Sequence, residues 1–241
     1  MQRPDAPPRE RTLSDRAYKS LHRDIMSGRL TAGSKLKLEG LVAEYEVGMS
    51  PLREALTRLV GDLLVVSEGQ RGFWVAPLSV AELDDVVRVR ALVETEAIGQ
   101  AIRLGDAEWE ACVRRAFETL SAVEARLPES ADALPQELIE EWESANQAFH
   151  AALVSACGSP WLIRLRDLLY RQSERYRRVS LNVSRQWRSV HEEHLAIFNA
   201  AMARNTLRAC RMTEEHLGRT ADEVRRAILA LSDGSEGDAA G

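Results

Sequence analysis

The sequence contains few cysteines, few aromatic residues and no long hydrophobic run. Its three cysteines, Cys112, Cys157 and Cys210, are widely spaced and include no CxxC pair, so we expect neither a disulfide framework nor a cysteine-based zinc site. A run of about 18 apolar residues is absent, which argues against a membrane-spanning helix. The N-terminal segment MQRPDAPPRE lacks the apolar core of a signal peptide. The simplest expectation is a cytoplasmic protein.

Positive charge is also scarce, but it is unevenly distributed. The 241-residue chain has a formal net charge of −5, which does not by itself indicate a nucleic-acid-binding protein. Residues 1–77 hold 12 Lys and Arg against 10 Asp and Glu, whereas residues 78–241 hold 20 against 27. The only lysines are Lys19, Lys35 and Lys37. The sign of this asymmetry is the one expected of an N-terminal DNA-binding module on an acidic body.

Two polar tails enclose the parts of the chain that are expected to fold. Residues 1–11 are rich in proline and charge, and residues 232–241 are rich in glycine and acidic side chains, so both are expected to be disordered. Between the tails, a composition change around Pro77 and Ser79 divides the chain. We therefore expect a first domain over 12–77 and a larger second domain over 78–231.

The first domain is predicted to combine three short helices with a hairpin. Apolar residues at helical spacing predict helices over 13–28, 38–47 and 50–61, and LTAGSKLKL between the first two is expected to be an extended link. Ser50 is the expected N-cap of the third helix, with Pro51 at its first position. A valine-rich apolar run, a glycine-bearing turn at Glu68–Gly72 and a second run of strand-forming residues, Phe73–Val75, are together typical of a hairpin. This order predicts a winged helix-turn-helix with a small β-hairpin wing.

The second domain shows no strand signal. Ser79 and Glu82 form a candidate capping box at its start. Short separators such as Gly105–Asp106 join long amphipathic stretches, which indicates an antiparallel bundle and a mainly α protein. We expect six helices, over about 80–104, 106–127, 135–157, 160–181, 184–203 and 206–231.

Several motifs together resemble the GntR family of bacterial transcription regulators, in the branch with an all-helical FCD domain. They span roughly residues 13–229 and include DIMSGRLTAGSKL, SPLREALTRL, LLVVSEGQRGFWVAPLS, NQAFHAAL and EEHLAIFNAAMARN. The combination of VGMSPLREALTRLV with ERYRR resembles the subgroup that represses genes for catabolism of small carboxylic acids such as glutarate or γ-aminobutyrate. The resemblance implies that the second domain binds an effector and dimerises, and that the protein is a regulator and not an enzyme.

A winged helix of this kind predicts which residues contact DNA. The N-terminal end of helix 50–61 would enter the major groove, where Arg53 can contact guanine or a phosphate. Family members often carry an arginine where Met49 stands, and methionine cannot donate a hydrogen bond. The alternative is an ordinary basic, solvated face, which is the interpretation we favour for Arg58. The candidate DNA contacts are Lys35, Lys37, Met49, Ser50, Pro51, Arg53, Gly69, Gln70, Arg71 and Gly72.

Three histidines of the second domain are candidates for a metal site. Asn146 and His150 lie four residues apart and share a helix face. His194 and His216 are equidistant from the turn at Asn205, so they can face one another across a helical hairpin. Many FCD domains bind a divalent ion through an aspartate and three histidines, and here Asn146 occupies the aspartate position. The resemblance implies a divalent metal ion, zinc or nickel. The alternative is three core histidines satisfied by polar neighbours.

One arginine lies within an apolar stripe of the second domain. Arg90 is flanked at helical spacing by valines, and if it is buried it needs an anionic partner. Glu94, four residues on, is the simple partner, whereas the family often uses an arginine here to bind an effector carboxylate. Arg177 and Arg178 are expected to be solvated. The cluster RQSERYRR adds the effector-binding candidates Arg171, Arg175 and Tyr176.

The resulting expectation is a homodimeric repressor. Two winged helices would bind the half-sites of a palindromic operator in double-stranded DNA, and a small carboxylate effector would alter that binding through the linker around Ala76–Ser79. Two alternatives stay open. One is a metal-dependent enzyme that uses the three histidines. The other is a DNA-binding adaptor whose helical domain only dimerises.

Overall fold

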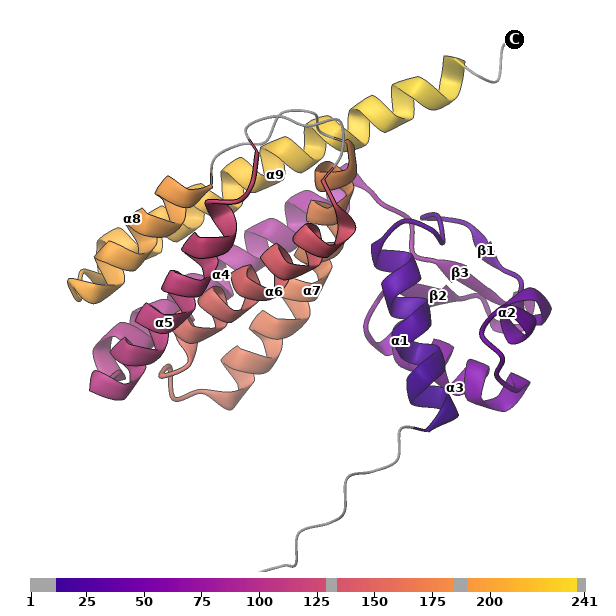
Figure 1. Cartoon of the computed structure of the whole chain (residues 1–241), viewed down its shortest axis with the longest axis horizontal. Helices are drawn as coiled ribbons and strands as arrows, with labels where there is room; N and C mark the ends of the chain where they lie inside the picture. Colours follow the sequence, from indigo (N-terminus) through magenta and orange to yellow (C-terminus); the bar gives the residue numbers. More distant parts are fainter. Residues whose placement is uncertain (1–11, 129–133, 184–189, 238–241) are drawn as a thin grey trace, which may run out of the picture. The chain divides into compact units, whose positions relative to one another are not determined.

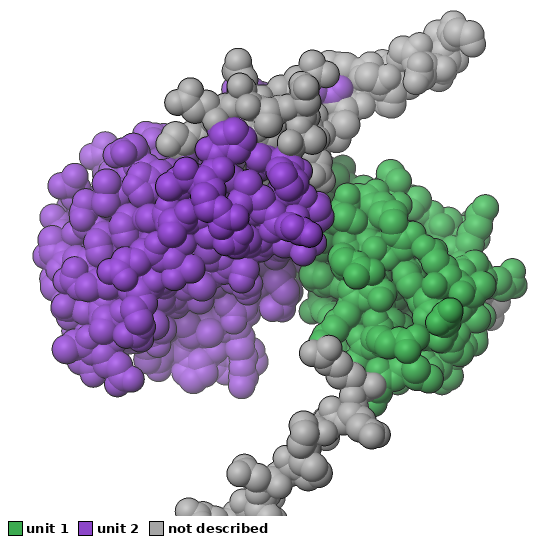
Figure 2. Space-filling view, in the orientation of Figure 1, with its two compact units in different colours: residues 1–78 green, residues 79–241 purple. Residues whose placement is uncertain are grey.

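The computed structural model describes residues 12–128, 134–183 and 190–237; for Gln70, residues 179–183 and residues 231–237 it describes the backbone alone. Both expected tails fall wholly or partly outside this part of the chain. The chain divides into two compact units, residues 1–78 and residues 79–241 (Figure 2). Each unit is described by itself below.

Unit 1 contains the three helices and the wing that the sequence predicts. Its elements are α1 (Leu13–Met26), β1 (Lys35–Leu36), α2 (Leu38–Glu44), α3 (Met49–Gly61), β2 (Val65–Ser67), the 3₁₀ turn η1 (Gly69–Arg71) and β3 (Phe73–Val75) (Figure 1). The prediction of a winged helix-turn-helix is confirmed.

The sheet of unit 1 has one more strand than the sequence analysis predicts. β3 lies between β2 and β1 and is antiparallel to both. β1 lies in the segment expected to be an extended link, where Leu36 pairs with Phe73 and is only 3% exposed. Two residues are too short for an alternating pattern to be visible in a sequence. The pairing with β3 therefore defines this strand.

The start of α3 differs from the prediction. Ser50 is not its N-cap, and Pro51 is not its first residue. The N-cap is Gly48, whose backbone is extended (φ −74°, ψ 163°), so that Met49 is the first helical residue. Proline is tolerated at the third position because the first four helix N–H groups have no partner within the helix. The apolar face that follows is as predicted: Leu52, Leu56 and other residues of this face are fully buried.

Unit 2 is an antiparallel helical bundle. α4 packs along α7 and α9, α5 along α6, and α8 along α9 (Figure 1). Within the described ranges, no helix combines the length and the apolarity needed to cross a membrane. The helices are α4 (Val80–Leu104), α5 (Ala107–Glu124), α6 (Gln136–Val154), α7 (Pro160–Val183), α8 (His191–Met202) and α9 (Thr206–Gly237).

Two helix ends of unit 2 differ from the prediction. α8 begins at His191 and not at residue 184, and residues 184–189 lie outside the described residues. α9 continues to Gly237, beyond the predicted end at residue 231. Asp, Ser and Gly lower helix propensity by only a fraction of a kcal/mol up to about 1 kcal/mol each, so a long preceding helix can extend through them.

The capping box predicted at the start of α4 is half formed. The Ser79 hydroxyl accepts a hydrogen bond from the Glu82 backbone N–H, at 3.4 Å. The Glu82 carboxylate does not return to Ser79 but accepts a hydrogen bond from the Tyr176 hydroxyl, at 2.7 Å. This contact ties α7 to the first turn of α4.

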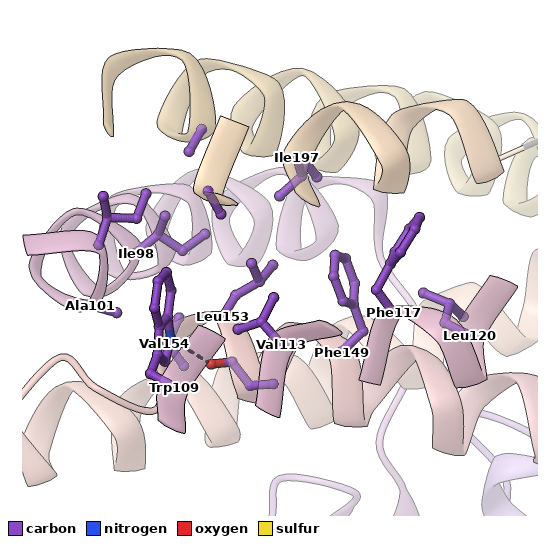
Figure 3. Packing of buried hydrophobic residues seen from close by; sticks show 14 of the residues in the cluster. Ile98, Ala101, Trp109, Val113, Phe117, Leu120, Phe149, Leu153, Val154 and Ile197 are labelled. Carbon is purple, nitrogen blue, oxygen red and sulfur yellow. Dashed lines mark hydrogen bonds between the residues drawn. The ribbon is translucent and has the colours of Figure 1, made fainter. Parts of the chain in front are cut away.

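Apolar side chains of α4, α5, α6 and α8 fill one part of the bundle (Figure 3). Phe117, Phe149 and Leu153 lie in this cluster with little or no exposed surface. The Trp109 indole N–H donates to the Ala152 carbonyl at 3.1 Å, which satisfies a buried polar group. The apolar cluster holds α6 and α8 together, and these two helices carry the polar groups described next.

Candidate functional site

His150, His194 and His216 lie together inside unit 2. They come from α6, α8 and α9, and all three are buried. Their ring centroids are 4.7–5.4 Å apart, and one nitrogen atom of each lies within 4.8 Å of the others. His194 and His216, which are equidistant from Asn205 in the sequence, are therefore close together in the structure. α6 adds His150 to them.

Two carboxylates hold two of these rings from outside. Glu124 of α5 lies 2.6 Å from Nδ1 of His194 and 3.0 Å from Nδ1 of His191. Glu193 of α8 lies 2.9 Å from Nδ1 of His216. Neither carboxylate was recognisable from the sequence, because the contacts from Glu124 span about 70 residues and the contact from Glu193 spans 23.

His150 differs from the other two histidines. The residue is 1% exposed, and neither ring nitrogen has a hydrogen-bond partner among the described residues. Burial lowers its pKa well below the ordinary value, and the neighbouring His216, His194, Arg90 and Arg166 act in the same direction. His150 is therefore held neutral, which leaves a lone pair on one ring nitrogen for a metal.

Asn146 lies one helical turn before His150. Its Nδ2 donates to the Tyr170 hydroxyl at 2.9 Å, while its Oδ1 is buried and has no hydrogen-bond partner in the described part of the chain. Nε2 of His194 is likewise unpartnered there. Unpaired buried polar atoms cost about 1–3 kcal/mol each unless something binds them. These nitrogen and oxygen donors fit a divalent ion of the zinc or nickel type.

Three buried arginines surround Tyr170 next to the histidines. The guanidinium carbons of Arg90, Arg166 and Arg177 lie 4.6–4.8 Å from the ring centroid of Tyr170. Burial raises the pKa of Tyr170 to about 12, although Arg177 next to it acts in the opposite direction. Cations at this distance from an aromatic ring are stabilised by it, particularly when they are desolvated.

Two buried carboxylates pair with this arginine cluster, and the half-buried Asp167 also accepts from Arg166 at 3.2 Å. Glu94 is the partner expected for Arg90, at 3.1 Å, but the same oxygen also accepts from Arg166 at 3.2 Å. Glu143 binds Arg177 through two hydrogen bonds, of 2.7 and 3.2 Å. The expectation that Arg177 is solvated is therefore wrong. Arg178 is half-buried and pairs with Glu174.

A small cavity of ≈ 10 Å³ reaches this cluster. Arg90, Arg177 and Ser173 line it on the polar side, and Leu83 and Val224 are among its apolar residues. A volume of this size is about that of one water molecule. Three predicted effector contacts, Arg171, Arg175 and Tyr176, are not among the residues that line the cavity.

The candidate DNA contacts lie mostly on the surface of unit 1. Pro51 and Gly72 are half-buried, and the side chain of Gln70 lies outside the described residues. Gly69 (φ 55°) and Gly72 (φ 115°) adopt backbone conformations that favour glycine, so the wing tip depends on them. The exposed candidates are Lys35, Lys37, Met49, Ser50, Arg53, Gly69 and Arg71.

The two arginines of α3 have different surroundings. Arg58 donates to Asp15 of α1 at 2.7 Å and lies 4.2 Å from the ring centroid of Tyr18, so its charge is used within unit 1. The Arg53 side chain makes no hydrogen bond or ion pair within the described residues. Arg53 is therefore the arginine of α3 that is available to a ligand.

Family models match both units. The model of bacterial regulatory proteins of the gntR family matches residues 13–75, and the FCD domain model matches residues 85–219. The HTH-type transcriptional regulator BphR of Paraburkholderia xenovorans is 41% identical over 216 residues, which cover 90% of this chain and 86% of that protein. The HTH-type transcriptional repressor GlaR of Escherichia coli is 37% identical, covering 83% and 90%.

Solved structures of the same kind share the fold. The Escherichia coli protein McbR/YncC superposes with a TM-score of 0.68 at 20% identity, covering 90% of this chain and 99% of that one. A GntR-type regulator from Rhodococcus sp. RHA1 also has a TM-score of 0.68, at 21% identity, covering 89% and 98%. The matched families and the relatives are transcription regulators, which confirms the expectation of a regulator and not an enzyme.

Proposed function

The chain belongs to the GntR family of bacterial regulatory proteins and carries an FCD domain, and from this premise we propose that it is a repressor controlled by a small organic acid. The observation that carries the proposal is the buried polar centre of unit 2. Three buried histidines lie beside three arginines that share two buried carboxylates, and ring nitrogens of His150 and His194 have no hydrogen-bond partner within the described residues. A domain that only dimerises has no need of such a centre, because apolar residues would stabilise it at least as well.

Unit 1 is the part that binds operator DNA. α3 enters the major groove with Arg53 near its N-terminal end, and the wing places Arg71 on the sugar-phosphate backbone or in the adjacent groove. Lys35 and Lys37 contact phosphates. Two copies in a homodimer bind the two half-sites of a palindromic operator, and a protein with this task works in the cytoplasm.

His150, His194 and His216 hold a divalent ion, with Asn146 Oδ1 as a further donor. Zinc and nickel both suit imidazole ligands. Three protein nitrogens leave coordination positions open, and the bound ion supplies a Lewis acid for an effector carboxylate. Asn146 would supply a neutral amide oxygen where the related domains have an aspartate, so the residues that would hold the ion carry no negative charge of their own.

Arg90, Arg166 and Arg177 attract the part of the organic acid that does not bind the metal ion. Glu94 serves Arg90 and Arg166 through one oxygen, and Nη2 of Arg166 has no hydrogen-bond partner within the described residues. An incoming carboxylate can satisfy this donor. The cavity holds about one water, so an acid binds only if side chains around Arg90 and Arg177 move. Such movement couples the effector to the arrangement of the helices, and through residues 76–79 to unit 1.

The test is an operator titration with controlled metal content. Purified protein is analysed for bound metal and its oligomeric state is measured by light scattering. Its affinity for DNA from the flank of its own gene is then measured with a panel of small mono- and dicarboxylates. We expect a dimer, bound zinc or nickel, and operator affinity that falls with one class of acid. Operator affinity unaltered at saturating concentrations of every acid would count against effector control.

A further inference from the structure

We propose that Glu124 and Glu193 are outer-sphere carboxylates of the metal centre. They hold His194 and His216 with Nε2 turned toward the ion, and they supply the negative charge that Asn146 does not. This inference rests on the proposed metal site and assigns two positioning residues to it. Neither carboxylate is a ligand of the ion in this proposal.

Glu124 determines the tautomer and the orientation of His194. Its side chain is 3% exposed, and its Oε1 lies 2.6 Å from Nδ1 of His194. Its other oxygen, Oε2, lies 3.0 Å from Nδ1 of His191, so both carboxylate oxygens face an imidazole nitrogen. An ionised carboxylate only accepts hydrogen bonds, so Nδ1 of His194 carries the proton. Its Nε2, which has no partner within the described ranges, is then the metal-binding atom.

Glu193 holds His216 in the same manner from a different helix. It is the residue before His194 on α8, and it reaches across to Nδ1 of His216 on α9 at 2.9 Å. Its other oxygen accepts from Arg219 at 3.2 Å, and Glu193 and His216 line a pocket of ≈ 120 Å³. Arg219 is 56% exposed, so solvent screens this carboxylate more than it screens Glu124. The effect of Glu193 on the metal is therefore the smaller of the two.

The charge balance at the metal centre is the second reason for assigning Glu124 and Glu193 to it. Three neutral imidazoles and an amide carry no charge, and Arg90 and Arg166 add positive potential at His150. A buried divalent ion in such surroundings is costly unless negative charge lies close by. Glu124 and Glu193 together carry two negative charges, which equal the charge of the ion. Outer-sphere carboxylates of this kind raise the basicity of histidine ligands.

The competing explanation is that both carboxylates only stabilise the fold. Replacing them would then lower the unfolding free energy of the metal-free protein without changing metal affinity. Glu110→Gln is the matched control, because Glu110 is a partly buried carboxylate of α5, the helix of Glu124, and it pairs with Arg204 through two hydrogen bonds and with no histidine in the described residues. The comparison of these variants separates positioning from packing.

The experiment measures zinc affinity by competition with a chromophoric chelator, on the full chain and without DNA. We expect a 10–100-fold weaker Kd for Glu124→Gln, a smaller loss for Glu193→Gln, and a change of less than about 3-fold for Glu110→Gln. Adding Asn146→Asp to either weakened variant should restore affinity, because it returns a negative charge to the centre. If Glu124→Gln does not fold, the zinc affinity of Glu193→Gln, with and without Asn146→Asp, is sufficient for the test.

Two negative results are distinguishable. Wild-type protein that binds zinc, together with glutamine variants that bind it equally well, would overturn this inference and leave the proposed metal site intact. Wild-type protein that binds neither zinc nor nickel would overturn the metal part of the proposed function, and this inference with it.

Discussion

The two units of the chain bury different kinds of side chain. Among the described residues, the buried polar or charged positions of unit 1 are Ser14 and Asp24, whereas unit 2 buries arginines, glutamates and histidines in its interior. Unit 1 keeps its candidate DNA-contacting cations at its surface, where they are hydrated. Unit 2 encloses its functional groups, where each charge needs a partner. Unit 1 thus has an ordinary apolar core, whereas burying charged groups lowers the stability that the core of unit 2 could otherwise have.

The largest expected effect comes from removing a buried partner in unit 2. Glu143→Ala leaves Arg177 buried without its two hydrogen bonds, and we expect a loss of about 3–5 kcal/mol in unfolding free energy. Denaturant unfolding followed by circular dichroism measures it. The matched change at the surface is Glu141→Ala, which removes the exposed partner of Arg126 and should cost less than about 1 kcal/mol. Equal losses in the two variants would remove the contrast between buried and exposed charge.

Metal binding should raise the stability of unit 2 against unfolding and leave the stability of unit 1 unchanged. Zinc at 100 times its Kd is expected to raise the unfolding free energy of unit 2 by about 2.7 kcal/mol, because the ion binds only the folded form. His150→Ala should abolish this stabilisation, and His22→Ala in α1 should preserve it. Thermal unfolding with zinc and with EDTA checks both. A gain that persists in His150→Ala would show that the ion binds elsewhere.

Substitutions on the proposed DNA-binding surface of unit 1 should change operator affinity and leave zinc affinity unchanged. Arg53→Ala is expected to weaken operator binding by about 1–3 kcal/mol, roughly 5–150-fold, with zinc affinity unchanged. A mobility-shift titration at fixed salt measures it. Arg211→Ala removes an equally exposed arginine from α9 and should leave operator affinity within about 2-fold. Unchanged affinity in Arg53→Ala would defeat the assignment of α3 to the groove.

The smallest effect concerns acid stability of unit 1. Burial opposes ionisation of Asp24, but hydrogen bonds from Arg29 and Tyr45 outweigh it and lower its pKa. The unfolded chain therefore binds the proton more readily, so the stabilisation is present above an ordinary aspartate pKa of about 3.9 and is lost as the pH falls below it. Asp24→Asn should remove this pH dependence at a cost of about 1 kcal/mol at pH 7. Stability that falls equally with acid in Asp24→Asn would refute it.

Local signals account for the parts of the fold that could be predicted. α4 runs from Val80 to Leu104, as expected, because Ser79 caps its start and Gly105 follows its end. The start of α3 was misplaced because Gly48 and Ser50 can both act as N-caps, and the backbone conformation of Gly48 decides between them. β1 was not predicted because its two residues form a strand only through their pairing with β3.

The candidate site was predictable in part. The spacing of His194 and His216 about Asn205 indicated their proximity, and the resemblance to FCD domains added His150 and Asn146. Arg166 and Tyr170 carried no signal, since an arginine and a tyrosine on an amphipathic helix are ordinary surface residues in a sequence. The packing of α7 against α4, α6 and α9 buries them.

By itself, the sequence determined which segments are helical, where the chain divides and which residue types lie on each helix face, because these depend on neighbours within a few positions. The tertiary structure decided the partners: Glu124 with His194, Glu94 with Arg166, and Glu143 with Arg177. These pairs join residues between 34 and 72 positions apart, and their existence depends on how the helices of unit 2 pack. Burial gives them their energetic weight, because a charge excluded from water is stable only beside a partner.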